Sequence, residues 1–151
     1  MKARNDNQLP ILKVSSKLFR SPQPDYNDLK QLQQRGLKAV VNVRAEVEDS
    51  LYYCRELKLT YKHFPVVDWK IPTDEQMDEF LFFLENPGNT PALVHCWAGV
   101  GRTGLFVTCH RVILGMNPTD AIAASDAETP GLGMNQLQRD WVMQFARQKR
   151  A

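Results

Sequence analysis

Ten consecutive residues, HCWAGVGRTG at 95–104, constrain this chain more than any other stretch of it. An apolar run at 92–94 precedes them and a helix-like run at 102–114 follows, so they are expected to form the turn between a buried strand and a helix N-terminus. The small residues in this turn allow successive backbone N–H groups to point at one centre, and the helix start adds partial positive charge. The sequence therefore predicts an anion site of a size that fits a phosphate.

Cys96 lies in the same predicted field. Thiols at helix N-termini beside cationic groups are acidified, so we expect Cys96 to be a thiolate and a nucleophile near neutral pH. Arg102 supplies a planar fork that can hold two phosphoryl oxygens and stabilise the charge of the transition state. The Thr103 hydroxyl is expected to hydrogen-bond the thiolate when it becomes a leaving group, and His95 is expected to orient the loop rather than to transfer protons.

A lone cysteine beside an apolar strand is more often a buried, inert thiol, and glycines after a strand often mark only a tight turn. A cysteine, an arginine, two glycines and a Thr-Gly pair at these spacings are together far more specific. The motif resembles the signature loop of the cysteine-dependent protein tyrosine phosphatase superfamily, with every signature position occupied. The resemblance implies that the substrate phosphate is bound by Trp97, Ala98, Gly99, Val100, Gly101 and Arg102.

A phosphoenzyme mechanism also needs a proton donor for the leaving oxygen, typically a carboxylic acid on a movable loop. Asp68 ends an apolar strand-like run and stands between two prolines, before a helix start at 73–76. Members of the superfamily carry an aspartate on such a loop, and here Asp68 lies 28 positions before Cys96. Asp68 is therefore the expected general acid. A turn or capping role is the alternative, and Asp74 is then the second candidate.

Basic side chains fall at or near the segments that should surround this site. Arg44 ends a buried-strand pattern and is expected either to bind substrate phosphate or to pair with Glu46 or Asp68. The complete set of possible substrate contacts is Arg44, Lys62, His63 and Lys70. Related phosphatases also place an amide before the last helix, where it supports the loop or positions the attacking water. The candidates for this amide are Asn135 and Gln136.

Short apolar runs alternate with helical patterns along the chain. The expected strands lie near 18–20, 39–43, 60–64 and 92–94. The expected helices lie at 25–35, 48–57, 73–84, 102–114, 119–127 and 136–148, and Gly36 is expected to end the first of them in a left-handed conformation. This order predicts an α/β fold, and the resemblance to the phosphatase superfamily implies a minimal PTP-like (dual-specificity phosphatase-like) fold. Its central, mostly parallel sheet would have helices on both faces and the ligand at the carboxyl ends of the strands.

Length and composition set the remaining expectations. The 151 residues suit a single PTP-like phosphatase domain over 1–151. A net charge of +2 without a basic stripe argues against nucleic acid, and no apolar run approaches the length of a membrane span. The three cysteines are an odd number without metal spacing, so a disulfide framework is not expected, and this favours a reducing compartment. Neither a metal nor a cofactor is expected. We expect a monomer, in the cytoplasm, or in the periplasm or outside the cell if a leader was removed.

The function indicated is a metal-independent phosphomonoesterase that works through a phosphocysteine intermediate. Within the superfamily, the SPQP segment at 21–24 and the spacing of Asp68 and Pro72 are similar to bacterial PTP-like phytases and to small atypical dual-specificity phosphatases. The resemblance favours inositol polyphosphates as substrates, with phosphoprotein as the alternative. A non-catalytic phosphate-binding module is less compatible with the chain, because such modules usually lose the cysteine or the acid. A rhodanese-type sulfurtransferase is a third, remote reading.

Overall fold

The computed structural model of the chain describes residues 9–150, and its centre is a five-stranded sheet in the order β1-β2-β5-β3-β4. The strands are β1 (Leu12–Ser15), β2 (Leu18–Ser21), β3 (Ala39–Arg44), β4 (Thr60–Val66) and β5 (Ala92–His95). β2, β5, β3 and β4 are parallel, and only β1, at the edge beside β2, runs antiparallel. The mostly parallel sheet expected from the sequence is confirmed, whereas β1 was not predicted.

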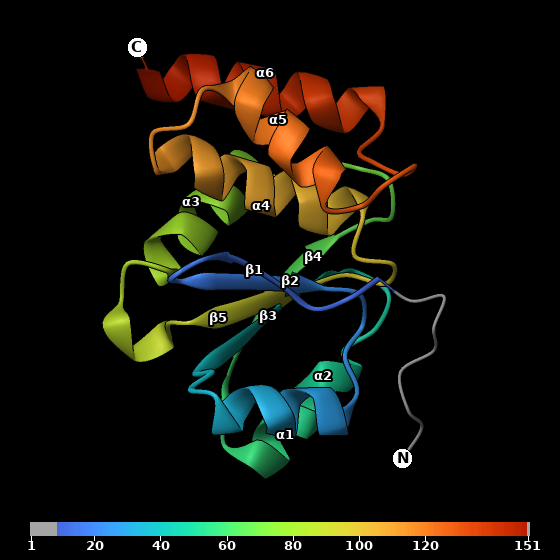
Figure 1. Ribbon diagram of the computed structural model, residues 1–151, viewed down its shortest axis with the longest axis vertical. Coiled ribbons are helices and arrows are strands. Elements are labelled where there is room, and N and C mark those ends of the chain that lie inside the picture. The colour runs from blue at the N-terminus through green and yellow to red at the C-terminus, as the bar shows by residue number, and fades with distance from the viewer. Residues whose placement is uncertain (1–8, 151) are drawn as a thin grey trace.

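Helices cover both faces of the sheet (Figure 1). One face carries α1 (Tyr26–Gln34) and α2 (Asp49–Leu57), and the other carries α3 (Asp74–Phe83), α4 (Gly101–Ile113), α5 (Pro118–Ala127) and α6 (Gln136–Arg150). A short 3-10 helix, η1 (Pro87–Asn89), precedes β5. The fold class and all six expected helices are confirmed.

The helices α1, α3 and α5 begin where a side chain accepts from their first N–H groups. Asp25 with Asp28 and Thr73 with Gln76 form capping boxes at α1 and α3. After α1, Gly36 has a φ of +104°, as its residue type predicted. Among residues 9–150, no helix is both long and apolar enough to cross a bilayer.

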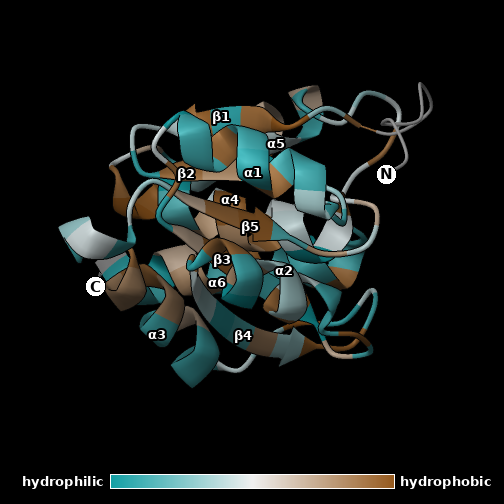
Figure 2. Ribbon diagram, turned by 90° about the horizontal axis from the view of Figure 1, so that it is seen from below, coloured by the Kyte–Doolittle hydropathy of each residue, from teal (hydrophilic) through white to brown (hydrophobic). Residues whose placement is uncertain are grey.

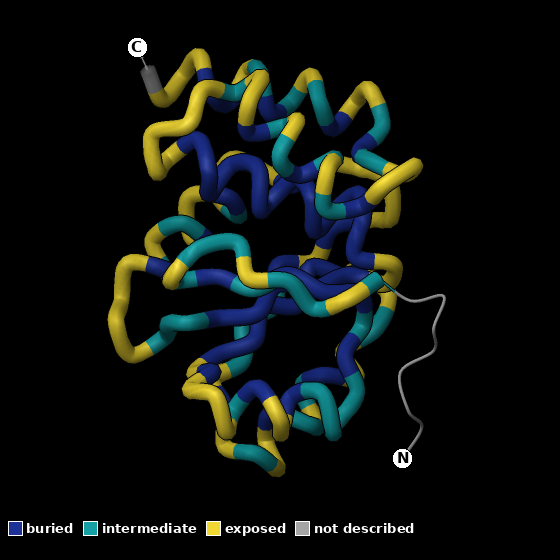
Figure 3. Tube along the Cα trace, in the orientation of Figure 1, coloured by how far each residue is buried: buried dark blue, intermediate teal, exposed yellow. Residues whose placement is uncertain are grey.

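Two apolar cores lie on either side of the sheet. α4 packs between the sheet and the pair α5 and α6, and it is buried from residue 101 to residue 112 (Figures 1 and 3). In Figure 2 the central strand β5 is coloured hydrophobic, while α1 and α3 carry much hydrophilic surface. Since four parallel strands end at one edge, the loops that follow them, at 22–25, 45–48, 67–73 and 96–100, meet there. That edge holds the candidate site.

Candidate active site

The signature loop, residues 96–102, joins β5 to α4 as predicted. Cys96 is only 3% exposed, and the backbone N–H of Gly99 donates to its Sγ at 3.3 Å. Gly99 has a φ of +79°, in the left-handed region that favours glycine. No side chain caps the N-terminus of α4, so the first N–H groups of this helix and its positive dipole end are directed at the space beside the thiol.

Cys54 and Cys109 differ from Cys96 in their surroundings. Both are fully buried among apolar side chains and form no disulfide. Burial raises the pKa of the Cys54 thiol to about 12 and that of Cys109 well above its ordinary value. These two thiols are therefore kept protonated and unreactive, and Cys96 is the cysteine whose Sγ accepts a backbone N–H of the loop.

Arg102 is buried and held in one orientation by Glu46. Its Nη1 donates to Glu46 Oε1 at 2.7 Å and to the carbonyl of Val66 at 2.9 Å, and its Nη2 donates to Glu46 Oε2 at 3.1 Å. Its Nε is buried without a hydrogen-bond partner in the described part of the chain, which leaves one N–H donor for a ligand oxygen. From the sequence, Glu46 was expected only as a partner of Arg44, so its pairing with Arg102 was not predicted.

Glu46 is itself shared between two arginines, since Arg44 Nε also donates to its Oε2, at 3.0 Å. The hydrogen bond from Arg102 lowers the pKa of Glu46 most strongly. Burial opposes this effect, but the bond from Arg44 adds to it, and the pKa of Glu46 falls to about 2. For Arg102, burial favours the neutral form, but the bonds and charge of Glu46 outweigh it and the pKa is raised. Both groups are therefore ionised at neutral pH, and Arg102 presents a fixed positive charge to the signature loop.

Asp68 lies on the loop after β4, residues 67–72, called the acid loop below. Its Oδ1 is 3.4 Å from Nη2 of Arg102, and its side chain is 62% exposed. The structure thus brings the candidate acid to the candidate phosphate site while leaving its carboxylate open to solvent and substrate. Asp74 lies in the first turn of α3 and lines a separate cavity with Trp141 and other residues of α6.

Two amide side chains at the start of α6, Asn135 and Gln138, hold the acid loop from behind. Asn135 Nδ2 donates to the carbonyl of Trp69 at 2.8 Å, and Gln138 Nε2 donates to that of Lys70 at 3.1 Å. Trp69 has a φ of +62°, a strained conformation for a residue with a side chain, so the loop depends on such contacts. Asn135 therefore supports the backbone of the acid loop.

Gln138 was not predicted. It is fully buried, and a Cβ on Gly101 would lie 3.1 Å from its amide, so the same side chain contacts both the acid loop and the start of α4. Its signal in the sequence was the spacing to Asn135, because the two side chains cap each other's backbone N–H groups. Gln136 instead donates to Asp140 at the exposed surface and shows no contact with the acid loop.

His95 is completely buried behind Cys96. Its Nδ1 lies 3.1 Å from the carbonyl of Cys96, and its Nε2 lies 2.8 Å from Ser50 Oγ. Burial lowers the pKa of His95 to about 4, so the ring is neutral at neutral pH. Since a carbonyl can only accept, Nδ1 carries the proton and the Ser50 hydroxyl donates to Nε2. These bonds suit the orienting role expected of His95.

The Thr103 hydroxyl is the group expected to hydrogen-bond the thiolate leaving group in the second chemical step. It is buried without a hydrogen-bond partner among residues 9–150, and the hydrogen bond recorded at Cys96 Sγ comes from Gly99 instead. Thr103 lies in the first turn of α4, one residue after Arg102.

Arg44 is buried at the end of β3, and its guanidinium already has protein partners. Besides Glu46, its Nη1 donates to Gln23 Oε1 at 2.6 Å, and its Cζ lies 4.9 Å from the ring centre of Trp97. The pairing with Glu46 that was expected as one role of Arg44 is present in the structure. Through Gln23 and Trp97 it also ties the β2–α1 loop to the signature loop.

The other basic candidates differ in how far they are engaged. Lys62 Nζ lies 3.6 Å from Glu79, and His63 Nδ1 lies 3.1 Å from Glu48. Lys70 is exposed on the acid loop and takes part in no salt bridge within residues 9–150. Of the four basic side chains, Lys70 is therefore the one whose charge is available at the surface beside Asp68.

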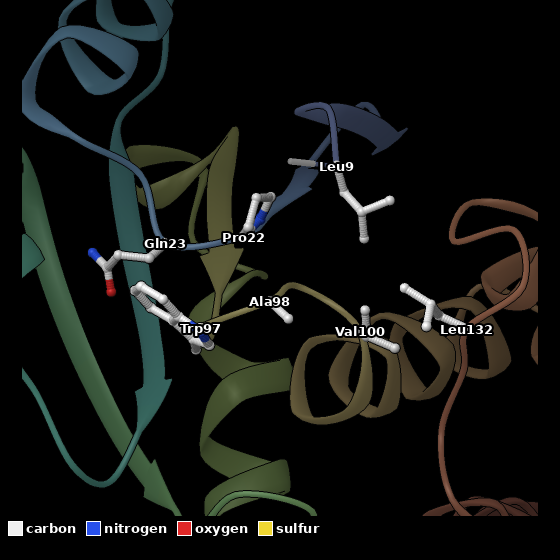
Figure 4. A pocket seen from close by; sticks show the side chains of 7 residues that line it. All are labelled: Leu9, Pro22, Gln23, Trp97, Ala98, Val100 and Leu132. Carbon is white, nitrogen blue, oxygen red and sulfur yellow. The ribbon is translucent and has the colours of Figure 1, made fainter. Parts of the chain in front are cut away.

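A small apolar cavity of about 220 Å³ adjoins the outer side of the signature loop (Figure 4). The side chains that line it come from the loop itself, from the residues before β1, from the segment after β2, and from the α5–α6 connection. They are Leu9, Pro22, Gln23, Trp97, Ala98, Val100 and Leu132. Within residues 9–150, no group of three or more His, Cys, Asp or Glu side chains is arranged to hold a metal ion.

The fold and this signature loop define the cysteine-dependent, PTP-like class of phosphatases. More narrowly, residues 2–144 match the family described as PTP-NADK, a DSP-PTPase phosphatase fused to NAD+ kinase, and the chain belongs to that family. OCA1 of Mycosarcoma maydis, named among the tyrosine-protein phosphatases, is 32% identical over 104 residues, which cover 65% of this chain and 66% of OCA1. A second OCA1, from Debaryomyces hansenii, is matched over 59% of its length. The chain therefore spans less than two thirds of the length of either relative.

Solved structures show the same fold. Tk-PTP in its active form superimposes with a TM-score of 0.80 at 22% identity, over 91% of this chain and 96% of Tk-PTP. The core catalytic domain of the PP-IP phosphatase SIW14 from S. cerevisiae, in complex with citrate, gives a TM-score of 0.76 at 21% identity, over 87% of this chain and 82% of that domain. At these identities the likeness establishes the fold.

Proposed function

We propose that the chain, acting as one phosphatase domain, hydrolyses phosphate monoesters through a phosphocysteine intermediate. Cys96 is the nucleophile, Arg102 binds the phosphoryl oxygens and Asp68 is the general acid. The observation that supports this is the meeting of three groups at the N-terminus of α4: a thiol that accepts a backbone N–H, an arginine whose Nε has no hydrogen-bond partner among residues 9–150, and a carboxylate 3.4 Å from that arginine.

In the first step Cys96 Sγ attacks phosphorus, an S–P bond forms, and the P–O bond to the leaving group breaks. Asp68 gives its proton to the leaving oxygen. The inward N–H groups of the signature loop and Nε of Arg102 donate to the non-bridging oxygens, whose charge they stabilise. In the second step water attacks phosphorus, the S–P bond breaks, and the Asp68 carboxylate takes a proton from the water. Inorganic phosphate leaves, and the thiolate is restored.

Two supports keep these groups in register. Glu46 binds both Nη atoms of Arg102, so the remaining Nε–H has a fixed direction. Asn135 and Gln138 hold the backbone of the acid loop, so Asp68 stays beside Arg102. Positional errors of about 1 Å in such groups cost about a hundredfold in rate, so these contacts matter for turnover.

Inositol polyphosphates are the first candidate substrates. Lys70 is exposed two residues after Asp68, and we expect its charge to contact a second phosphate on the same molecule. The fold neighbour SIW14, described as a PP-IP phosphatase, supports the same class. Arg44, Lys62 and His63 contribute less than their residue types suggested, because each already has an acidic partner.

A phosphoprotein substrate is the second candidate, and the aromatic surface at the site favours it. Trp97 is 62% exposed on the signature loop, and Trp69 is 49% exposed on the acid loop. Flat rings beside a phosphate site can pack against the aromatic ring of a phosphotyrosine. The OCA1 relatives, named among tyrosine-protein phosphatases, support this candidate.

The two candidates are separated by comparing kcat/KM for inositol hexakisphosphate with that for phosphotyrosine peptides. If polyphosphates are the substrates, Lys70→Ala should raise KM for the hexakisphosphate several-fold and leave KM for an aryl monophosphate unchanged. Lys62→Ala, which removes a charge already paired with Glu79, is the matched control and should change neither. A tenfold preference of the wild type for phosphopeptides would reject the polyphosphate assignment and retain the phosphatase.

A non-catalytic binding module is tested in the same preparation. Turnover of p-nitrophenyl phosphate that vanadate inhibits and chelators do not affect is the expected result for the enzyme. Binding of vanadate without any turnover would instead identify a phosphate-binding module.

A further inference from the structure

The last two residues of β2 and the two that follow it, residues 20–23, lie against the outer side of the signature loop. β2 and β5 are parallel neighbours, with Arg20 opposite Val94 and Ser21 opposite His95, so the chain leaves both strands at the same edge. Gly99 comes so near to this segment that a Cβ on it would lie 2.6 Å from the backbone N of Pro22. Two backbones are therefore in direct contact behind the phosphate site.

Two hydrogen bonds join the segment to the loop at alternate carbonyls. The backbone N–H of Gln23 donates to Trp97 O at 2.8 Å, and Nη2 of Arg20 donates to Gly99 O at 2.8 Å. In a trans peptide unit the C=O and the following N–H point in opposite directions. Holding these two carbonyls outward therefore turns the N–H groups of Ala98 and Val100 toward the inside of the loop, where an anion would be bound.

Arg20 is itself fixed in place by a second charged group. It is 2% exposed, and its Nη1 donates to Glu128 Oε1 at 2.9 Å, just beyond α5. Glu128 also accepts two bonds of 2.8 Å from Arg111. Burial lowers the pKa of the Arg20 guanidinium, and the bond and charge of Glu128 oppose that effect. The pair with Glu128 thus keeps Arg20 charged and directs its other nitrogen at Gly99.

We propose that Arg20 is a positioning residue of the phosphate site, which through the Gly99 carbonyl sets the direction of the Val100 N–H, and that Glu128 positions Arg20. Arg20 lies 76 positions before Cys96 and outside the signature motif. This role rests on the proposed function only for the position of the bound anion. The bond from Arg20 to the Gly99 carbonyl shapes the loop whether or not the protein turns over a substrate.

The test measures the affinity for inorganic tungstate, an unreactive phosphate analogue, by calorimetry, together with the thermal midpoint of each variant. Arg20→Met should raise the Kd for tungstate about tenfold or more, since one oriented donor to an oxyanion is worth about 10²–10³ in rate. Arg20→Lys should change Kd in the same direction, because a single ammonium cannot serve Glu128 and the Gly99 carbonyl together. If Arg20→Met does not fold, Arg20→Lys carries the test.

Arg111→Met is the matched control. Arg111 is buried and bonded to the same Glu128, but within residues 9–150 its side chain donates to Ser125 and Glu128 and not to the signature loop. The Arg111→Met variant should lower the thermal midpoint as Arg20→Met does, and its Kd for tungstate should stay within about twofold of the wild type. An unchanged Kd in the folded Arg20 variants, or an equal loss of affinity in Arg111→Met, would overturn the proposal.

Tungstate binding and turnover by the wild type distinguish a failure of this proposal from a failure of the proposed function. Tungstate binding without turnover of any phosphate ester would overturn the proposed function alone. Failure of the wild type to bind tungstate would overturn both.

Discussion

Acid should destabilise the protein through His95. The pKa of this buried ring is about 4 in the folded chain, against an ordinary value of 6.5. Because the folded value is the lower one, the unfolded chain takes up the proton first as the pH falls. Stability that is fully present above pH 6.5 is therefore lost progressively down to pH 4. At about 1.4 kcal/mol per pH unit the loss amounts to about 3 kcal/mol, a large part of the 5–15 kcal/mol typical of a folded domain.

The prediction is tested by urea unfolding of the wild type and His95→Asn between pH 7.5 and 4. Asparagine keeps an N–H donor for the Cys96 carbonyl but has no group that takes up a proton in this range. The wild type should lose about 3 kcal/mol more than the variant between pH 6.5 and 4. The reasoning is refuted if both proteins lose the same free energy of unfolding over this interval.

His110 provides an internal comparison. It is buried, lies 2.8 Å from Ser15 Oγ, and its pKa is likewise lowered to about 4 by burial. His110→Asn should therefore remove a similar part of the acid sensitivity and leave the part due to His95 in place. The double variant should show both losses removed, because the two rings have no bonding partner in common.

Three substitutions at the site have distinct kinetic outcomes. Asp68→Asn should lower kcat by about 10²–10⁴ for alkyl phosphates and by much less for p-nitrophenyl phosphate, whose leaving group needs no proton; equal losses would reject Asp68 as the acid. Arg102→Lys should lower kcat/KM at least about a hundredfold, because an ammonium cannot bind both oxygens of Glu46 and the phosphoryl group; activity near that of the wild type would contradict this. Asn135→Ala should lower kcat several-fold through the acid loop, and it should cause little further loss when Asp68 is already Asn; additive losses would point to another role for Asn135.

Local patterns in the sequence predicted most of this fold. The signature loop, four of the five strands and the six helices are each encoded by neighbouring residues, through apolar spacing, caps and glycines. β1 was missed because its four residues are only partly buried and its pairing with β2 is interrupted by a register shift. An edge strand of this kind has no periodicity long enough to recognise.

The supports of the site could not be predicted for a different reason. Glu46 binds Arg102 from 56 positions away, and Arg20 reaches Gly99 from 79 positions away. Such pairs depend on which strands become neighbours in the sheet, and a local pattern does not carry that order. Gln138 was overlooked because its role requires knowing that the start of α6 lies against the acid loop.

The central claim, that Cys96 forms a covalent bond to phosphorus, is tested most directly by rapid acid quench during turnover of an aryl phosphate, followed by peptide mass spectrometry. The account predicts the added mass of one phosphoryl group on the peptide that contains Cys96 and none on those containing Cys54 or Cys109. It also predicts that Cys96→Ser still binds tungstate, shows no phosphoryl adduct, and turns over at less than about one-thousandth of the wild-type rate. Turnover by Cys96→Ser at a rate near that of the wild type would contradict the account.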